Sequence, residues 1–356
     1  MTDGLRVAVA GATGAVGRQM LRCLEQRSFP VAELRPLASA RSAGRTVPFA
    51  GQQLPVQVMG PGSFEGVDVA LFSCGGGTSL QFAPQAVAAG ALVIDNSSAW
   101  RMDSEVPLVV PEVNPEAIAS FLQRADGGRV PAGIIANPNC STIQLVVALR
   151  PLHDAAGLRR VVVSTYQSAS GAGQRAVDEL YAQAAASPAL GGPGVHSGPV
   201  VVHPTTLAFN AIPHIDVFMD DGATREEWKM TVESRKILGL PDLPLHATCV
   251  RIPVERSHSE AVNVELERPL SPAQARALLA DAPGVQILDD PAASPPVYPT
   301  PLQTAGTDAT WIGRIRADDS VTPAGHGLAM WVVSDNLLKG AALNAVQIAE
   351  AVFGSE

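Results

Sequence analysis

The chain has 356 residues, a length that predicts two domains rather than one. Its hydrophobic content of 46%, its charged content of 17% and its 32 glycines are typical of a compact α/β protein and exclude an intrinsically disordered one. The net charge of -9 and the absence of a Lys/Arg run argue against a nucleic-acid-binding surface, although a local arginine pocket can still hold an anionic substrate.

The four cysteines are scattered, with no C-x-x-C pair. This spacing predicts neither a metal site nor a disulfide framework and favours a reducing compartment. The first nine residues lack the basic region of a signal peptide, so we expect a cytoplasmic protein. Residues 69–94 carry no charge and are long enough for a membrane span, but Gly75–Gly77 and Pro84 divide them into strand, loop, helix and strand.

Strands and helices alternate in the first part of the chain. Strands are predicted at residues 5–10, 33–38, 67–72 and 91–95, with helices at 16–25 and between the last two strands. This alternation predicts a Rossmann-type, doubly wound parallel sheet.

The pattern changes after residue 140. Strands are predicted at 159–167, 246–253, 261–266, 309–316 and 327–334, with a loop and helix at 171–186, a proline-rich irregular loop at 291–301 and a long helix at 336–353. These elements indicate a second α+β domain with a mixed sheet.

A glycine loop, Gly11–Gly17, joins the first strand to the first helix. Its small residues allow backbone N–H groups and a helix N-terminus to approach a pyrophosphate. A glycine loop alone can be a tight turn, but its place after the first strand of an alternating chain predicts a dinucleotide site.

The end of the second strand indicates which dinucleotide is bound. An NAD site usually has an acidic residue there, whereas this chain has Ser39, Arg41 and Ser42, which suit the 2′-phosphate of NADP. Arg41 can instead be a solvated loop charge. Gly75–Gly77 can form a second backbone cradle or a flexible turn.

Cys140 follows Asn137-Pro138-Asn139 at the start of an apolar helix. A thiol in the first turn of a helix is close to unpaired N–H groups, which favour the thiolate and make it a candidate nucleophile. The alternative is a buried structural cysteine. Cys23 and Cys249 lie in apolar patterns and are predicted to be core residues.

A dinucleotide fold with an activated thiol suggests aldehyde oxidation through a thioester, which needs a base and a group that holds the substrate. Arg251, at a strand end, can bind a carboxylate, and His258, in a short loop beyond it, can shuttle protons because its ordinary pKa is about 6.5. Each also has a plainer interpretation, a surface charge and one of seven histidines. Arg101 is a further candidate for anion binding.

A second charged group lies at the start of a predicted helix. Glu226 and Lys229 are one helical turn apart on the same face. The spacing alone favours an exposed ion pair.

Seven segments together resemble the aspartate-β-semialdehyde dehydrogenase family, and they occur in that family's order over almost the whole chain: GATGAVG, NSSAWRMD, ANPNCST, YQSASGAG, EEWK, RIPVERSHS and WVVSDNLLKGAALNAVQIAE. The resemblance implies the reversible reaction in which aspartate semialdehyde, phosphate and NADP⁺ give aspartyl phosphate and NADPH. It also implies a place on the route to lysine, threonine and methionine.

The resemblance further implies roles for individual residues. Cys140 is expected to be the nucleophile, His258 the general acid/base, and Gln167 the residue that orients the acyl intermediate. The substrate-binding residues are expected to be Arg251 for the α-carboxylate, Glu226 for the α-ammonium group, Arg101 and Lys229 for the phosphate, and Asn139. The cofactor-binding residues are expected to be Gly11, Thr13, Gly14, Ala15, Val16, Gly17, Ser39, Arg41, Ser42, Ser73, Gly75, Gly76, Ser170, Gly171 and Asn336, the last near the nicotinamide.

The resemblance places the NADP-binding domain at 1–139 and 334–356, and a catalytic and dimerisation domain at 140–333, so a homodimer is expected. One departure is visible: members often have glycine before the catalytic histidine, where this chain has Ser257. Because serine fits most backbone conformations, this is expected to matter little.

Two other functions remain open. N-acetyl-glutamyl-phosphate reductase shares the Cys/His chemistry, but its substrate carries a neutral acetamide, whereas Arg251, Glu226 and Lys229 favour a free amino acid. A non-catalytic NADP-binding redox sensor using Cys140 predicts cofactor binding without turnover.

Overall fold

The computed structural model describes residues 4–123, 130–187 and 198–354. They form two compact units, one of residues 1–139 with 340–356 and one of residues 140–339. Residues 334–339, expected in the first domain, group with the second unit because Asp335 and Asn336 accept hydrogen bonds from Gly306 N and Ser257 N of that unit. The chain ends of the predicted first domain, 1–3 and 355–356, lie outside the described residues.

The first unit contains a six-stranded parallel sheet in the order β5-β2-β1-β6-β7-β8. Its strands are β1 (Leu5–Ala10), β2 (Val31–Ala38), β5 (Gln57–Val58), β6 (Val69–Phe72), β7 (Leu92–Asp95) and β8 (Gly133–Ala136), and its helices are α1 (Ala15–Gln26), α2 (Gly76–Ala88), α3 (Glu116–Leu122) and α9 (Leu343–Phe353). A short hairpin of β3 (Thr46–Phe49) and β4 (Gln52–Pro55) and the 3₁₀ turn η1 (Ala40–Ser42) lie between β2 and β5. The predicted doubly wound sheet is therefore confirmed.

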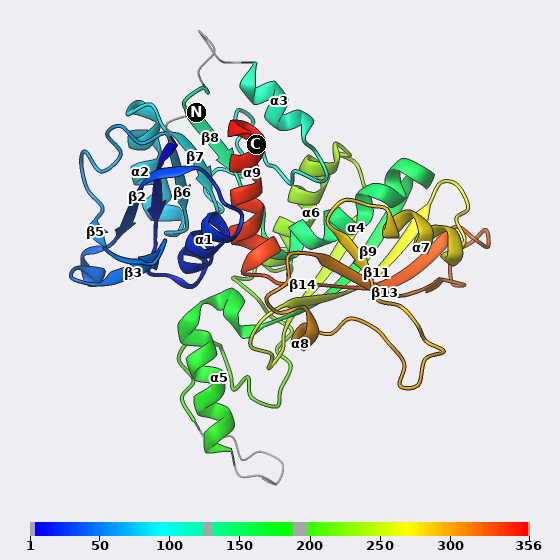
Figure 1. Cartoon of the computed structure of the whole chain (residues 1–356). Helices are drawn as coiled ribbons and strands as arrows, with labels where there is room; N and C mark the ends of the chain where they lie inside the picture. The colour runs from blue at the N-terminus through cyan, green and yellow to red at the C-terminus, as the bar shows by residue number, and fades with distance from the viewer. Residues whose placement is uncertain (1–3, 124–129, 188–197, 355–356) are drawn as a thin grey trace. The chain divides into compact units, whose positions relative to one another are not determined.

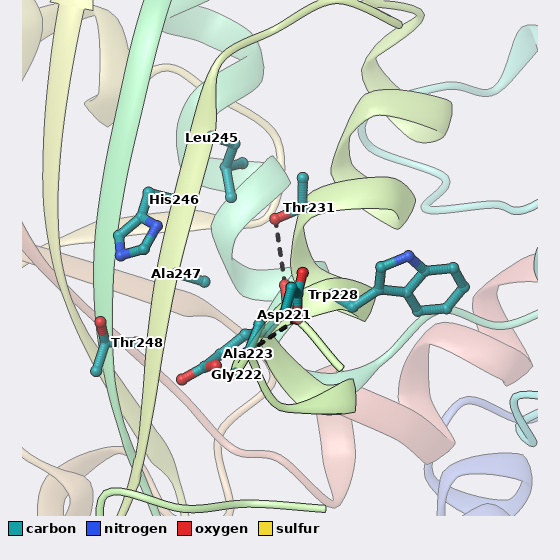
Figure 2. Close-up of a pocket in the computed structure, with 10 residues that line it drawn as sticks. Asp221, Gly222, Ala223, Trp228, Thr231, Leu245, His246, Ala247 and Thr248 are labelled. Atoms are coloured by element: carbon teal, nitrogen blue, oxygen red, sulfur yellow. Dashed lines mark hydrogen bonds between the residues drawn. The ribbon is translucent and has the colours of Figure 1, made fainter. Parts of the chain in front are cut away.

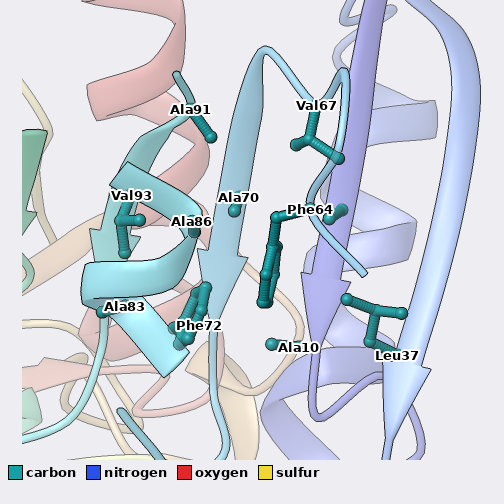
Figure 3. Close-up of a cluster of buried hydrophobic side chains, with 11 residues drawn as sticks. Ala10, Leu37, Phe64, Val67, Ala70, Phe72, Ala83, Ala86, Ala91 and Val93 are labelled. Atoms are coloured by element: carbon teal, nitrogen blue, oxygen red, sulfur yellow. The ribbon is translucent and has the colours of Figure 1, made fainter. Parts of the chain in front are cut away.

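The strand order reverses between β1 and β6, because β1 leads through α1 to β2 on one side and β6 leads through α2 to β7 on the other. Right-handed crossovers in opposite directions place α1 and α2 on opposite faces of the sheet. On the α2 face, Ala83 and Ala86 pack with Phe64 and Phe72 in a cluster of buried side chains (Figure 3). Ligands of such sheets bind where the strand order reverses, beyond the carboxyl ends of the strands.

The second unit contains a six-stranded mixed sheet in the order β10-β9-β11-β14-β13-β12. Its strands are β9 (Leu158–Gln167), β10 (Leu245–Arg251), β11 (His258–Leu266), β12 (Val285–Ile287), β13 (Thr310–Ala317) and β14 (Gly327–Ser334), and its helices are α4 (Cys140–Ala156), α5 (Gln174–Ala186), α6 (Arg225–Leu238), α7 (Pro272–Ala280) and α8 (Pro301–Thr304). Helices α4, α6 and α7 pack on this sheet (Figure 1). The mixed sheet predicted for the second domain is also confirmed.

Two local predictions were wrong. His258 is the first residue of strand β11 rather than part of a loop, because the turn after β10 closes within 252–257. The final helix was expected from residue 336, but the chain first forms the π-helical turn η3 (Leu338–Ala342), and α9 begins at Leu343. Residues 69–94 form β6, α2 and β7, and no described helix is both long and apolar enough to cross a bilayer.

Candidate active site

Cys140 is the first residue of α4 and is partly exposed. The loop that precedes it, 137–139, is held in the first unit by the Asn137 side chain. Asn137 Nδ2 donates to Asn96 Oδ1 at 2.7 Å, and Asn137 Oδ1 accepts from Asn344 Nδ2 at 2.7 Å. These bonds fix the point at which the chain enters α4, and the positive end of a helix dipole favours a negatively charged group there.

Arg101 is nearly buried in the first unit, with 6% of its surface exposed. Its Nε donates to the Asn137 carbonyl at 2.9 Å, and Nη2 donates to the Asn96 carbonyl at 3.0 Å. The two carbonyls therefore fix the position of the Arg101 guanidinium beside the loop that leads to Cys140. The side chain of an exposed arginine would be freer to move.

In the second unit, three of the predicted residues lie in neighbouring positions of the mixed sheet. Arg251, the last residue of β10, is paired in register with Gln167, the last residue of β9. His258 begins β11, whose next residue, Ser259, pairs with Tyr166. The register therefore brings together side chains that lie up to 91 residues apart in the sequence, and all three are buried.

His258 is fully buried, and its ring is oriented by Ser168. The Ser168 backbone N–H donates to His258 Nδ1 at 3.1 Å, so the proton of the neutral ring lies on Nε2. Burial, together with the nearby Arg251 charge, holds the pKa of His258 well below 6.5. The ring is therefore neutral at pH 7, unlike the ordinary histidine on which the proton-shuttle expectation was based. No described residue pairs with His258 Nε2.

Gly171 keeps the space between these two residues open. A Cβ atom at this position would lie 2.9 Å from a guanidinium nitrogen of Arg251 and 3.3 Å from His258 Nε2. The structure thus places Gly171, which the resemblance assigned to the cofactor, directly against the candidate catalytic groups. Arg251 also donates to the Ser168 carbonyl at 2.6 Å, and its charge interacts with Cys140.

Glu226 and Lys229 are a partly buried pair rather than an exposed one. Lys229 Nζ donates to Glu226 Oε2 at 3.2 Å and to Asp216 Oδ2 at 2.6 Å. Burial alone lowers the pKa of Lys229, but the two carboxylates outweigh this effect and raise it. The lysine is therefore charged at neutral pH, and Glu226, only 5% exposed, lies within 3.2 Å of Gln167 Nε2.

Ser257 has a backbone conformation that serine adopts only at a cost. Its φ of 71° lies in the left-handed region that favours glycine, so the expectation that serine fits easily here was wrong. Asn336 holds this turn, because its Oδ1 accepts from Ser257 N at 2.9 Å and from the hydroxyls of Ser168 and Ser170 at 3.2 and 3.3 Å. Asn336 thereby joins the turn that precedes His258 to the segment that carries Gly171.

The glycine loop of the first unit fits a pyrophosphate. A Cβ at Gly11 would lie 2.4 Å from the Ser73 carbonyl oxygen, and one at Gly17 would lie 2.1 Å from the Gly11 carbonyl oxygen, so both positions require glycine. Helix α1 begins after Gly14 and has no side-chain cap among the described residues, and α2 begins in the same way after Gly75, whose φ is 83°. Two helix N-termini without such caps at the switch point of the sheet are suited to phosphate groups.

The loop after β2 lies against this glycine loop. Thr13 Oγ1 and Ser42 Oγ are 3.0 Å apart, so the candidate 2′-phosphate residues join the candidate pyrophosphate residues. Arg41 and Ser39 are exposed beside them. The predicted cofactor residues of the first unit thus lie near the carboxyl ends of β1, β2 and β6.

A separate pocket of about 540 Å³ lies between α6 and the edge strand β10 (Figure 2). Its lining includes Asp221, Trp228, Thr231, His246 and Thr248. None of the candidate catalytic residues is among those that line it, so this pocket is separate from the candidate active site.

Three further polar residues beside the candidate groups are fully buried and had no predicted role: Ser168, Thr165 and Glu260. Glu260 follows His258 by two residues in a strand, so both face the same side of the sheet. The sequence pattern of an acidic residue two positions after the candidate catalytic histidine could therefore have indicated Glu260. Burial raises the pKa of Glu260 well above 4.5, and the Gln144 side chain opposes this shift.

Two family models match the chain. Residues 6–121 match the family model of the semialdehyde dehydrogenase NAD binding domain, and residues 149–339 match that of the semialdehyde dehydrogenase dimerisation domain. The chain is 51% identical to aspartate-semialdehyde dehydrogenase of Aquifex aeolicus, over 98% of this chain and 97% of the relative. It is 50% identical to that of Bacillus subtilis, over 99% and 98%.

Solved structures are similar over the same length. The fold matches aspartate semialdehyde dehydrogenase II of Vibrio cholerae complexed with ASA, with a TM-score of 0.89 and 46% identity over 98% of both chains. It also matches aspartate semialdehyde dehydrogenase of Candida albicans with NADP, with a TM-score of 0.75 and 27% identity over 98% of both chains. The chain therefore belongs to the aspartate-semialdehyde dehydrogenase family.

Proposed function

We propose that this protein catalyses the reversible reductive dephosphorylation of L-4-aspartyl phosphate to L-aspartate 4-semialdehyde, in the biosynthesis of lysine, threonine and methionine. The observation that carries the proposal is the pair of opposite charges among the buried groups of the second unit. Arg251 can bind a carboxylate, and Glu226, which lies beside Gln167, can bind an ammonium group. A substrate with a free α-amino group needs both charges.

The chain's own residues account for the transfer of the acyl group to sulfur and for its release. In the biosynthetic direction the Cys140 thiolate attacks the acyl phosphate carbonyl, a thioester forms and inorganic phosphate leaves, held by Arg101 and Lys229. A dinucleotide held by the glycine loop of the first unit would supply the hydride for reduction of the thioester carbonyl. The carbon–sulfur bond then breaks, the aldehyde leaves and Cys140 is again a thiolate. His258 is the general acid/base beside the reacting carbonyl, Asn139 contacts the substrate, and Gln167 orients the acyl group.

NADP is the proposed cofactor. The loop after β2 carries no acidic residue at the ribose position, and Ser39, Arg41 and Ser42 offer a cation and two hydroxyls to a 2′-phosphate. Thr13, Ala15, Val16, Ser73 and Gly76 complete the cradle of the first unit, with Ser170, Gly171 and Asn336 at the nicotinamide end.

A second copy of the chain is the proposed macromolecular partner. The matched family model is described as a dimerisation domain and covers most of the second unit. We expect a cytoplasmic homodimer that uses this unit, with an NADP-binding domain at 1–139 and 334–356 and a catalytic domain at 140–333.

The test is the initial rate of NADP⁺ reduction with L-aspartate semialdehyde, with and without phosphate, and the same assay with NAD⁺. We expect NADPH formation that depends strictly on phosphate, because phosphate must release the aspartyl group from the thioester. Activity with N-acetyl-glutamate semialdehyde alone would assign the protein to the arginine pathway. Cofactor binding without turnover of either aldehyde would leave the redox sensor as the function.

A further inference from the structure

A row of buried polar side chains lies directly beneath the candidate catalytic row of the mixed sheet. Thr165 on β9 is paired in register with Cys249 on β10 and with Glu260 on β11. Each lies two residues along its strand from Gln167, Arg251 or His258, so the two rows share one face of the sheet. All three residues of the lower row are fully buried, with 0% of their surface exposed.

The hydrogen bonds of this row have a defined direction. The Met230 thioether has no hydrogen to donate, so the Cys249 thiol must donate to it, at an Sγ–Sδ distance of 3.6 Å. The Cys249 sulfur therefore accepts from the Thr165 hydroxyl, a bond that opposes the rise in the Cys249 pKa caused mainly by burial. With its only hydrogen directed at Cys249, Thr165 Oγ1 can serve Gln167 only as an acceptor.

The direction of these hydrogen bonds determines how the Gln167 amide is oriented. Its Nε2 donates to Thr165 Oγ1 at 3.3 Å and to Glu226 Oε1 at 3.2 Å. A carboxylate also only accepts, so both partners require the N–H₂ end of the amide. Both N–H bonds are then used, and no described residue donates to Gln167 Oε1.

We propose that Thr165 is a positioning residue: with Glu226 it holds the amide of Gln167 so that the carbonyl oxygen faces the substrate and accepts a hydrogen bond from its α-ammonium group. This inference rests on the proposed substrate. The ammonium group then has two acceptors, the Glu226 carboxylate and the Gln167 carbonyl. Gln167 orients the acyl chain by holding its amino end, and Thr165 contributes to the selection of a free amino acid without touching it.

The test compares two substrates on three variants. Thr165→Val removes the acceptor at nearly constant shape, Thr165→Ser keeps it, and Thr248→Val is the matched control. Thr248 lies on the neighbouring strand β10, is exposed, and lines the separate pocket of Figure 2. The substrates are L-aspartate semialdehyde and succinate semialdehyde, which lacks the amino group; slow turnover of the latter is timed with enzyme in excess.

We expect Thr165→Val to lower kcat/KM for L-aspartate semialdehyde about tenfold, chiefly through KM, since a lost hydrogen bond in a buried site has an effect of this order. The same variant should change kcat/KM for succinate semialdehyde by less than about twofold. Thr165→Ser should restore most of the loss, and Thr248→Val should match the native enzyme.

Equal losses with both substrates, or no loss with either, would overturn the inference. If Thr165→Val does not fold, Met230→Leu tests the same point from the other end. Leucine removes the thioether, so the Cys249 thiol can donate to Thr165 Oγ1 instead. We then expect a smaller loss of kcat/KM that is selective for L-aspartate semialdehyde. An equal effect on both substrates would again overturn the inference. Failure of the proposed function is distinct, because the native enzyme would then not turn over L-aspartate semialdehyde.

Discussion

The glycine loop of the first unit and the strand ends of the second unit form their candidate binding sites from different chemical groups. The loop uses backbone: seven consecutive residues, 11–17, turn the chain and expose helix N–H groups. Gly11 and Gly17 are needed there because no side chain would fit at either position. The strand ends use side chains from segments far apart in sequence, whose direction is set by hydrogen bonds such as Ser168 to His258. A backbone site depends on local shape, whereas a side-chain site depends on register and on proton positions.

Among replacements in the second unit, that of Cys140 should lower the enzymatic activity most. Cys140→Ala is expected to abolish phosphate-dependent turnover, by about 10³-fold or more, because it removes the sulfur on which the thioester forms. Cofactor binding, measured by NADPH fluorescence, should be unchanged.

Alkylation provides the matched comparison with the first unit. Burial and the nearby Asp95 charge raise the pKa of Cys74 to about 12, so this thiol should resist iodoacetamide at pH 8 while Cys140 reacts. Mass spectrometry of the alkylated protein measures both. Modification of Cys74 at the rate of Cys140 would contradict the prediction.

Replacement of Gly17 should affect the first unit through its backbone alone. Gly17→Ala places a Cβ 2.1 Å from the Gly11 carbonyl oxygen, so the loop must shift. We expect NADPH binding to weaken about 5- to 150-fold, which corresponds to the 1–3 kcal/mol typical of overpacking. Fluorescence titration measures it. Gly60→Ala is the control, because a Cβ there meets nothing within 4 Å. Unchanged binding by Gly17→Ala would show that the loop is not tightly packed.

Glu260 should make the stability of the second unit depend on pH. Burial raises its pKa above that of the unfolded chain, so the folded state binds a proton more tightly. Its contribution to stability is fully present below about pH 4.5 and is lost as the pH rises through the folded pKa. Glu260→Gln removes this loss, so its advantage in urea unfolding over the native protein should grow from pH 5 to pH 9. A constant difference would argue that Glu260 does not titrate in this range.

The smallest effect is expected at Ser257. Because its φ of 71° favours glycine, Ser257→Gly should raise the free energy of unfolding by about 0.5–1 kcal/mol, the strain being partly offset by the greater freedom of glycine in the unfolded chain. Urea unfolding measures the change, and kcat should stay within about twofold. Destabilisation would indicate that the serine hydroxyl contributes more than the backbone strain costs.

Much of the fold could be predicted because its signals are local. The first strand, 5–10, and the strand 327–334 were placed at the observed residues, since continuous runs of apolar residues between turn residues are unambiguous. The hairpin 46–55 and the two-residue strand β5 were not predicted, because such short segments carry no periodicity. The π-helical turn at 338–342 was missed for a related reason: its residues fit an α-helical pattern, and the widened turn depends on packing.

The sequence by itself determined the two-domain α/β architecture, the glycine loop and the position of Cys140 at a helix start, because each depends on residues close together in the chain. Only the tertiary structure decided that His258 is buried and neutral, that Ser257 is strained, and that Gln167 directs its N–H₂ group at Thr165 and Glu226. These properties depend on burial and on the register between distant strands. Desolvation and hydrogen-bond direction arise only when those segments meet.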